Sequence, residues 1–156
     1  MNERAWINLM NKIREGNVIP IIGPQLLVEA DGHTSLQARI AARLLQDCGM
    51  DPGEVPLPPF RELNAAVSQL KGSVDDSELY DCVNNAIHNV TSASDFAMPE
   101  PIRQLSQIAD FRLFVTLTPD DLLARSLRQR CAANEIIHSL KLASEATPDL
   151  PEDWIK

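Results

Sequence analysis

Apolar residues recur at helical spacing over several stretches of the chain. Trp6 and the apolar residues that follow it predict a first amphipathic helix, which ends at Gly16. Ser35 is a predicted cap for a second helix that ends near Gly49. The same periodicity predicts three more helices, over residues 61–70, 77–90 and 101–109.

Continuous apolar runs predict the strands. Val18–Ile22 is rich in β-branched residues and is typical of a strand buried on both faces. A second strand is predicted over Phe111–Leu117, and a short third one over Ile136–Leu140. After the second strand, Thr118-Pro119 predicts a helix start, with Thr as the cap and Pro at the first helical position, and this helix should reach about Arg130.

Strands that alternate with helices indicate an α/β fold with a small Rossmann-like parallel sheet and a helical insertion between the strands. We expect residues 1–50 and 110–145 to form the α/β core, 51–109 the helical insertion, and 146–156 an acidic tail or a linker to missing sequence. Because parallel strands need cover on both faces, this small sheet looks unfinished. Either more sequence or a partner surface should cover it.

Composition limits the function classes. The 156 residues are 44% hydrophobic, and the net charge of -8 argues against binding to nucleic acid. No apolar stretch reaches 18 residues, so no membrane span is expected. The three cysteines form no C-x-x-C pair and predict a reduced, cytoplasmic protein. The three histidines have no zinc-binding spacing, so no metal is expected.

Candidate binding residues follow the two main strands. Open α/β sheets bind ligands at the carboxyl ends of their strands, where Gly23 would let a phosphate approach the backbone. The alternative is a plain turn that glycine permits. Pro24 has no N–H to offer a phosphate. Gln25 is either a ribose or adenine contact or an ordinary loop residue. Thr118 and Asp120 either line a pocket or start the next helix.

Two of these segments resemble motifs of one family. Val18-Ile-Pro-Ile-Ile-Gly-Pro-Gln-Leu-Leu27 is similar to the strand and Gly-Ala-Gly-x-Ser loop that holds the NAD phosphates in sirtuin-like domains. Phe114-Val-Thr-Leu-Thr-Pro-Asp-Asp-Leu-Leu123 is similar to the strand of that family that ends in Thr-Thr-Asn-x-Asp. A helical module between the motifs is also a family feature. The resemblance covers about residues 5–145 and points to the N-terminal part of a sirtuin-like domain of bacterial antiphage defence and signalling proteins.

The resemblance implies an NAD-binding fold and, through its departures, a degenerate site. Only the first motif glycine is kept, as Gly23, and Thr118 stands at the position of the catalytic asparagine. Threonine lacks the amide that orients ribose and water. Asp120 matches the motif aspartate, and the general-base histidine of the family has no assigned counterpart here, because His138 comes too early. The resemblance implies cofactor contacts from Gly23, Pro24, Gln25, Thr116, Thr118 and Asp120, with Thr118 and Asp120 as the catalytic candidates.

Three hypotheses follow. The first is a degenerate sirtuin-like module that senses, regulates or assembles an immune or stress-signalling protein, binds NAD or ADP-ribose, and works with an effector domain or protein partner. The second is an active NAD hydrolase completed by missing sequence or by oligomerisation. The third is a ligand-free interaction domain, in which the first helix pairs across a two-fold axis of a homo-oligomer rather than covering the sheet.

Overall fold

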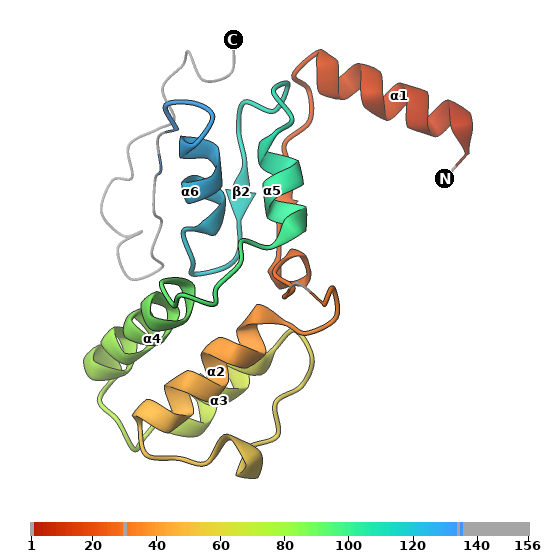
Figure 1. The fold of residues 1–156 in the computed structure, drawn as a ribbon. Helices are drawn as coiled ribbons and strands as arrows, with labels where there is room; N and C mark the ends of the chain where they lie inside the picture. The colour runs from red at the N-terminus through yellow and green to blue at the C-terminus, as the bar shows by residue number, and fades with distance from the viewer. Residues whose placement is uncertain (1, 30, 134, 136–156) are drawn as a thin grey trace. The chain divides into compact units, whose positions relative to one another are not determined.

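The computed structural model describes residues 2–29, 31–133 and 135, and it divides the chain into two compact units (Figure 1). One unit holds residues 1–22 and 104–156, and the other holds residues 23–103. The predicted strand Ile136–Leu140, His138 and the tail lie outside the described residues. Helices and one small parallel sheet make this a mixed α/β protein.

The first unit contains the sheet. It begins with helix α1 (Glu3–Arg14), whose cap is Asn2, because the Asn2 side chain accepts a hydrogen bond from the Ala5 N–H at 2.9 Å. Strand β1 (Ile21–Ile22) pairs in parallel with β2 (Val115–Thr116), and helix α6 (Leu122–Arg128) follows. The predicted parallel pairing of the two strands is therefore confirmed.

Both strands are shorter than predicted. Pro20 has no N–H to donate to a ladder, so the Val18–Ile22 run forms only a short strand. The ladder uses the Pro20 carbonyl, which accepts from the Val115 N–H at 2.9 Å, and the Ile22 carbonyl, which accepts from the Leu117 N–H at 2.8 Å. Beyond Ile22 the chain turns into a 3₁₀ segment, η1 (Pro24–Leu26).

The helix start predicted at Thr118-Pro119 is wrong. Helix α6 begins at Leu122, four residues later than the predicted cap. The reason is the Asp120 carboxylate, which accepts a hydrogen bond from the Leu122 N–H at 3.1 Å. An aspartate that binds the backbone two residues ahead favours a turn over a helix, so Thr118, Pro119 and Asp120 stay outside α6.

The second unit is helical. Its elements are α2 (Leu36–Asp47), a 3₁₀ segment η2 (Pro52–Glu54), α3 (Glu62–Leu70) and α4 (Asp76–Thr91). Helix α5 (Glu100–Ser106) contains the division between the units. The predicted helix over 77–90 is thus confirmed, as is the Ser35 cap, whose Oγ accepts from the Gln37 N–H at 3.1 Å.

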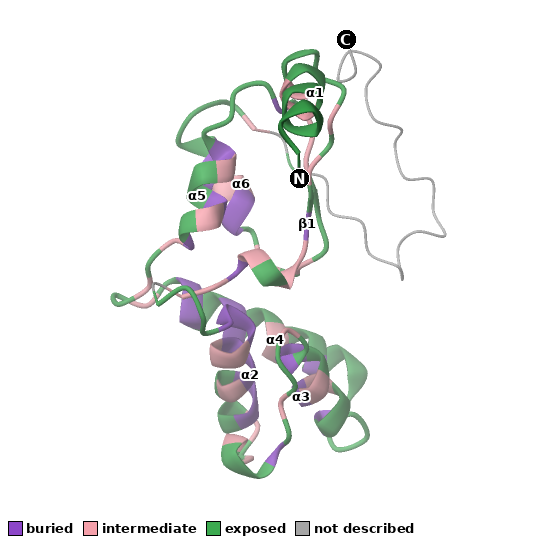
Figure 2. Ribbon diagram, turned by 90° about the vertical axis from the view of Figure 1, so that its right-hand side faces the viewer, coloured by how far each residue is buried: buried purple, intermediate pink, exposed green. Residues whose placement is uncertain are grey.

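Helix α2 provides most of the core of the helical unit. It packs on α3 and α4, and its apolar side lies buried along its length (Figure 2). Leu44 and Leu45 have no exposed surface. The sequence grouped this helix with the strands, whereas in the structure its packing partners are helices, because its apolar stripe matches those of α3 and α4. The buried apolar residues of α2 are Leu36, Ile40, Ala41, Leu44 and Leu45.

Candidate functional site

The strand ends define the first part of the site. Ile21 pairs with Val115 and Ile22 with Thr116, so the two parallel strands end at the same edge of the sheet. Thr116 is exposed. Gly23 is bonded to Ile22 and begins the other compact unit. A crevice shared by Gly23 and Thr118 stays a prediction.

Gly23, Pro24 and Gln25 lie in one tight turn. The Gly23 carbonyl accepts from the Leu26 N–H at 3.2 Å, and the Pro24 carbonyl accepts from the Leu27 N–H at 3.0 Å. Gly23 has φ -112° and ψ -179°, an extended conformation that any residue adopts. A Cβ built at this position would meet nothing within 4 Å. Neither the backbone conformation nor the packing at position 23 therefore requires a glycine. This weakens the interpretation that Gly23 is there to permit a turn.

Thr118 and Asp120 do come together, in a local arrangement. The Asp120 carboxylate accepts from the Leu122 N–H, and it is also hydrogen-bonded to Thr118. Burial raises the pKa of the Asp120 carboxyl above its usual value, and the hydrogen bonds with Thr118 and Leu122 partly oppose this rise. The Asp120 carboxylate thus fixes the backbone before α6. Both candidates for catalysis are occupied with each other and with the helix start.

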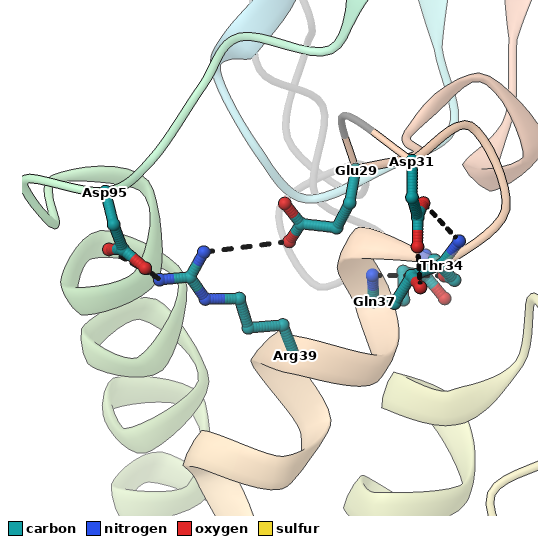
Figure 3. Close-up of polar contacts among 7 residues, drawn as sticks. Glu29, Asp31, Thr34, Gln37, Arg39 and Asp95 are labelled. Atoms are coloured by element: carbon teal, nitrogen blue, oxygen red, sulfur yellow. Dashed lines mark hydrogen bonds and ion pairs between the residues drawn. The ribbon is translucent and has the colours of Figure 1, made fainter.

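Two polar clusters of the helical unit have no counterpart in the sequence analysis (Figure 3). In the loop before α2, the Asp31 carboxylate accepts from the N–H groups of His33 and Thr34, each at 2.8 Å, and from the Thr34 hydroxyl. The hydrogen bond from the Thr34 side chain, together with those from the two backbone N–H groups, lowers the pKa of Asp31 to about 2. This cluster shapes the loop, and His33 is an exposed loop residue.

The second cluster is an ion-pair network around Arg39 of α2. One guanidinium nitrogen of Arg39 donates to both carboxylate oxygens of Asp95, each at 2.8 Å. The other terminal nitrogen lies 3.8 Å from the Glu29 Oε1. Figure 3 shows Arg39 extending between the two acidic residues. Arg39 therefore joins the segment before α2 to the segment after α4, a structural role.

In the part of the chain that the structure describes, no group of three or more His, Cys, Asp or Glu side chains is placed to hold a metal ion. None of the described helices combines the length and the apolar character that crossing a membrane requires. His88 is exposed on α4, and its Nδ1 lies 3.5 Å from the Ser92 hydroxyl.

Comparison with known proteins gives no match to a protein-family model, to a curated protein or to a solved structure. Any functional conclusion therefore depends on the chain itself. The site residues that the sequence indicated fall into two local groups, the Gly23–Gln25 turn and the Thr118–Asp120 segment. Of the contacts that it missed, those of Asp31 are local, whereas the ion pair between Arg39 and Asp95 joins residues far apart in the chain, which no local spacing predicts.

Proposed function

We propose that this chain is a non-catalytic regulatory or assembly module of the sirtuin-like kind, which serves a bacterial immune or stress-signalling protein. The observation that carries the assembly part is an uncovered apolar face on the strand pair. Ile21 and Val115 are paired neighbours and are 67% and 39% exposed. Leu117, two residues after Val115, is 69% exposed, and Ile19, two residues before Ile21, is 53% exposed. We call Ile19, Ile21, Val115 and Leu117 the strand face.

The strand face is unusual for a parallel pair, because parallel strands are normally covered on both sides. On the opposite side of the same strand, Ile22 is 1% exposed. Contiguous exposed apolar residues of this kind typically mark an interaction surface. The strand face therefore supports a function in which another protein surface completes the sheet.

Helix α1 supplies a second unburied apolar surface in the same unit. It is amphipathic, and none of its residues is buried (Figure 2). Trp6 and Ile7 are each more than half exposed. The alternative that this helix covers the sheet finds no support in the described residues, since no residue of the helix is buried and the strand face is exposed. A second copy of the chain offers both surfaces that a first copy leaves open, so self-association is the form of assembly that we propose.

The proposed assembly is weak. Full burial of an apolar side chain stabilises by about 1.5–3 kcal/mol, so covering the four half-exposed residues of the strand face contributes about 4 kcal/mol. Two-fold symmetry doubles this figure, and the loss of translational and rotational freedom on association opposes it. We expect dissociation constants of the self-association from micromolar to millimolar. In this range, an effector fused or bound to the module would determine the affinity of the whole assembly.

The ligand part of the proposal is NAD or ADP-ribose bound without turnover. Support comes from the two motif-like segments that follow β1 and β2, and from a Gly23 that neither conformation nor packing requires. The non-catalytic part is supported by Asp120, whose carboxylate is engaged by Leu122 and Thr118. A general base or water-orienting group needs a polar atom aimed at the substrate, and the hydrogen bonds of this carboxylate instead tie it to its own chain.

Three assays test the proposal. Chromatography of NAD incubated with the full chain at high micromolar concentration should show no nicotinamide release, and calorimetry should show ADP-ribose binding. Light scattering over a concentration series should show self-association of the wild type that Leu117→Glu abolishes. Tyr80→Glu is the matched control, because Tyr80 is similarly exposed at 64% but lies on α4 in the other unit. Robust nicotinamide release would instead establish the NAD hydrolase, and a strictly monomeric wild type would remove the assembly function.

A further inference from the structure

A proline-rich stretch of the helical unit carries an inference that is independent of the proposed function. Residues 56–59 have the sequence Pro-Leu-Pro-Pro and lie between η2 and α3. We call them the proline segment. Their P-x-x-P spacing is that of ligands for grooves that bind polyproline II helices. The proline segment belongs to the helical unit, whereas the strand face lies in the other unit.

The sequence of the proline segment favours an extended backbone. Each proline ring holds φ at about -65°, and a residue that precedes a proline is pushed into the β or polyproline II region. Val55 and Leu57 both precede prolines, and Val55 has φ -103° and ψ 120°. Residues 56–58 belong to no helix or strand. These constraints together favour the polyproline II conformation, which needs no internal hydrogen bonds.

The prolines of the segment are accessible. Pro56 and Pro59 are exposed, and Leu57 between them is half-buried. A polyproline II helix has about three residues per turn, so residues 56 and 59 lie on the same side of it. Pro58 is exposed as well. A partner can therefore reach the side of the segment that carries the two prolines of the motif.

Both ends of the proline segment are fixed. Before it, Val55 is buried and follows η2, which packs on α2. After it, the Pro58 carbonyl accepts from the Arg61 N–H at 3.0 Å, and Phe60 has φ 60°. A positive φ at the third residue is typical of a type II turn, whose second residue, here Pro59, keeps an extended backbone. Because the segment is preformed, binding a partner costs little conformational entropy.

A rigid spacer is the competing explanation for a run of prolines. A spacer sets the distance between bodies that would otherwise move independently. Here the elements on either side, η2 and α3, both pack on α2 within one compact unit. Their separation is thus already determined by packing, and a spacer does not account for the exposed prolines.

We propose that the proline segment docks in the aromatic-lined groove of a partner protein, in the manner of the ligands of SH3 and WW domains. Aromatic side chains of the groove pack on the rings of Pro56 and Pro59. Arg61, two residues beyond Pro59, is exposed and pairs with a carboxylate at the end of the groove. The helical unit thus has a binding site of its own for a second protein.

The test titrates the isotope-labelled full chain with a purified SH3 domain and, separately, with a purified WW domain, and follows the amide signals by NMR. At least one domain should shift the signals of Leu57, Phe60 and Arg61, which report for the prolines because proline has no N–H. If neither domain shifts these signals at millimolar concentration, the proposal fails, and this readout needs no variant to fold. Shifts centred on the strand face would also overturn it.

Two variants locate the contacts. Pro59→Ala should weaken binding about tenfold or more, because it removes one of the two motif prolines. Arg61→Ala should weaken binding less at high salt than at low salt, because salt screens an exposed ion pair. Both variants should keep the helical circular dichroism of the wild type. Wild-type affinity in a folded Pro59→Ala variant would contradict the proposal.

Pro151→Ala is the matched control. Pro148 and Pro151 have the same P-x-x-P spacing, lie outside the described residues, and are followed by Glu152 and Asp153 rather than by an arginine. This variant should bind the domain as tightly as the wild type. A loss of binding in Pro151→Ala that equals or exceeds the loss in Pro59→Ala would overturn the assignment to the proline segment.

Discussion

Replacing Gly23 with alanine separates a binding role from a turn role at the end of β1. Gly23 has φ -112°, and a Cβ there would meet nothing within 4 Å. Alanine fits such a position without strain and reduces the conformational freedom of the unfolded chain. We therefore expect Gly23→Ala to raise the free energy of unfolding by about 0.4–1 kcal/mol.

Gly49 provides a matched control in the same unit. It also has nothing within 4 Å of an added Cβ, but its φ is +75°. A left-handed conformation costs an alanine about 1–2 kcal/mol, which exceeds the gain from the unfolded state. Gly49→Ala should therefore lower stability by up to about 1 kcal/mol, and the two variants should change the free energy of unfolding in opposite directions.

The assay has two readouts. Urea unfolding, followed by helical circular dichroism, gives the free energy of unfolding of both variants, and their slopes should equal that of the wild type. Calorimetric titration with ADP-ribose gives affinity. If a phosphate approaches the backbone at Gly23, the added methyl group should weaken binding by about tenfold, which is about 1.4 kcal/mol, whereas Gly49→Ala should leave affinity unchanged.

Two results would refute this reasoning. A loss of stability in Gly23→Ala as large as that in Gly49→Ala would mean that glycine is needed for the turn. Unchanged ADP-ribose affinity in a stable Gly23→Ala variant would remove Gly23 from the proposed ligand contacts.

Three further predictions concern stability. Asp31→Ala should destabilise the chain only above the pH range in which Asp31 titrates: the pKa of Asp31 is lowered from 3.8 to about 2, so its contribution is present above pH 3.8 and is lost as the pH falls through about 2. Acid unfolding curves of wild type and variant should therefore converge near pH 2, and a constant difference would contradict this. Asp120→Asn should gain stability relative to wild type as the pH rises above 3.8, because burial raises the pKa of the folded-state carboxyl and thereby disfavours its charged form; a difference that is largest in acid would be the wrong sign. Leu44→Ala should cost about 2–5 kcal/mol in urea unfolding, since Leu44 is fully buried in the core of the helical unit, and a loss below 1 kcal/mol would show that α2 is not packed as described.

Local signals in the sequence predicted local features well. The Ser35 cap and the apolar periodicity of 77–90 are confirmed, because capping and helical spacing act over a few residues. The local signal at Thr118-Pro119 gave a wrong prediction. Both residues favour a helix start, but the Asp120 carboxylate accepts a hydrogen bond from the backbone N–H of Leu122, and α6 begins only at Leu122.

Features that depend on tertiary packing could not be predicted from the sequence. The ion pair between Arg39 and Asp95 depends on how segments far apart in the chain pack together, which periodicity alone does not specify. The small size of the predicted sheet indicated that it needs further cover, but the apolar run Val18–Ile22 does not tell which side of the strand is exposed, because a run reports apolar character and not which side is shielded.

The central claim is that the strand face joins two copies of this chain. The most direct measurement is photo-cross-linking, with a benzophenone amino acid in place of Leu117 or, as the control, in place of Tyr80 on α4. We predict that the Leu117 replacement gives a covalent product of twice the 17.3 kDa chain mass, and that its cross-linked peptides come from the strand face or α1 of the second copy. A product of equal yield from the Tyr80 replacement, or none from the Leu117 replacement at concentrations where the wild type associates, would contradict the account.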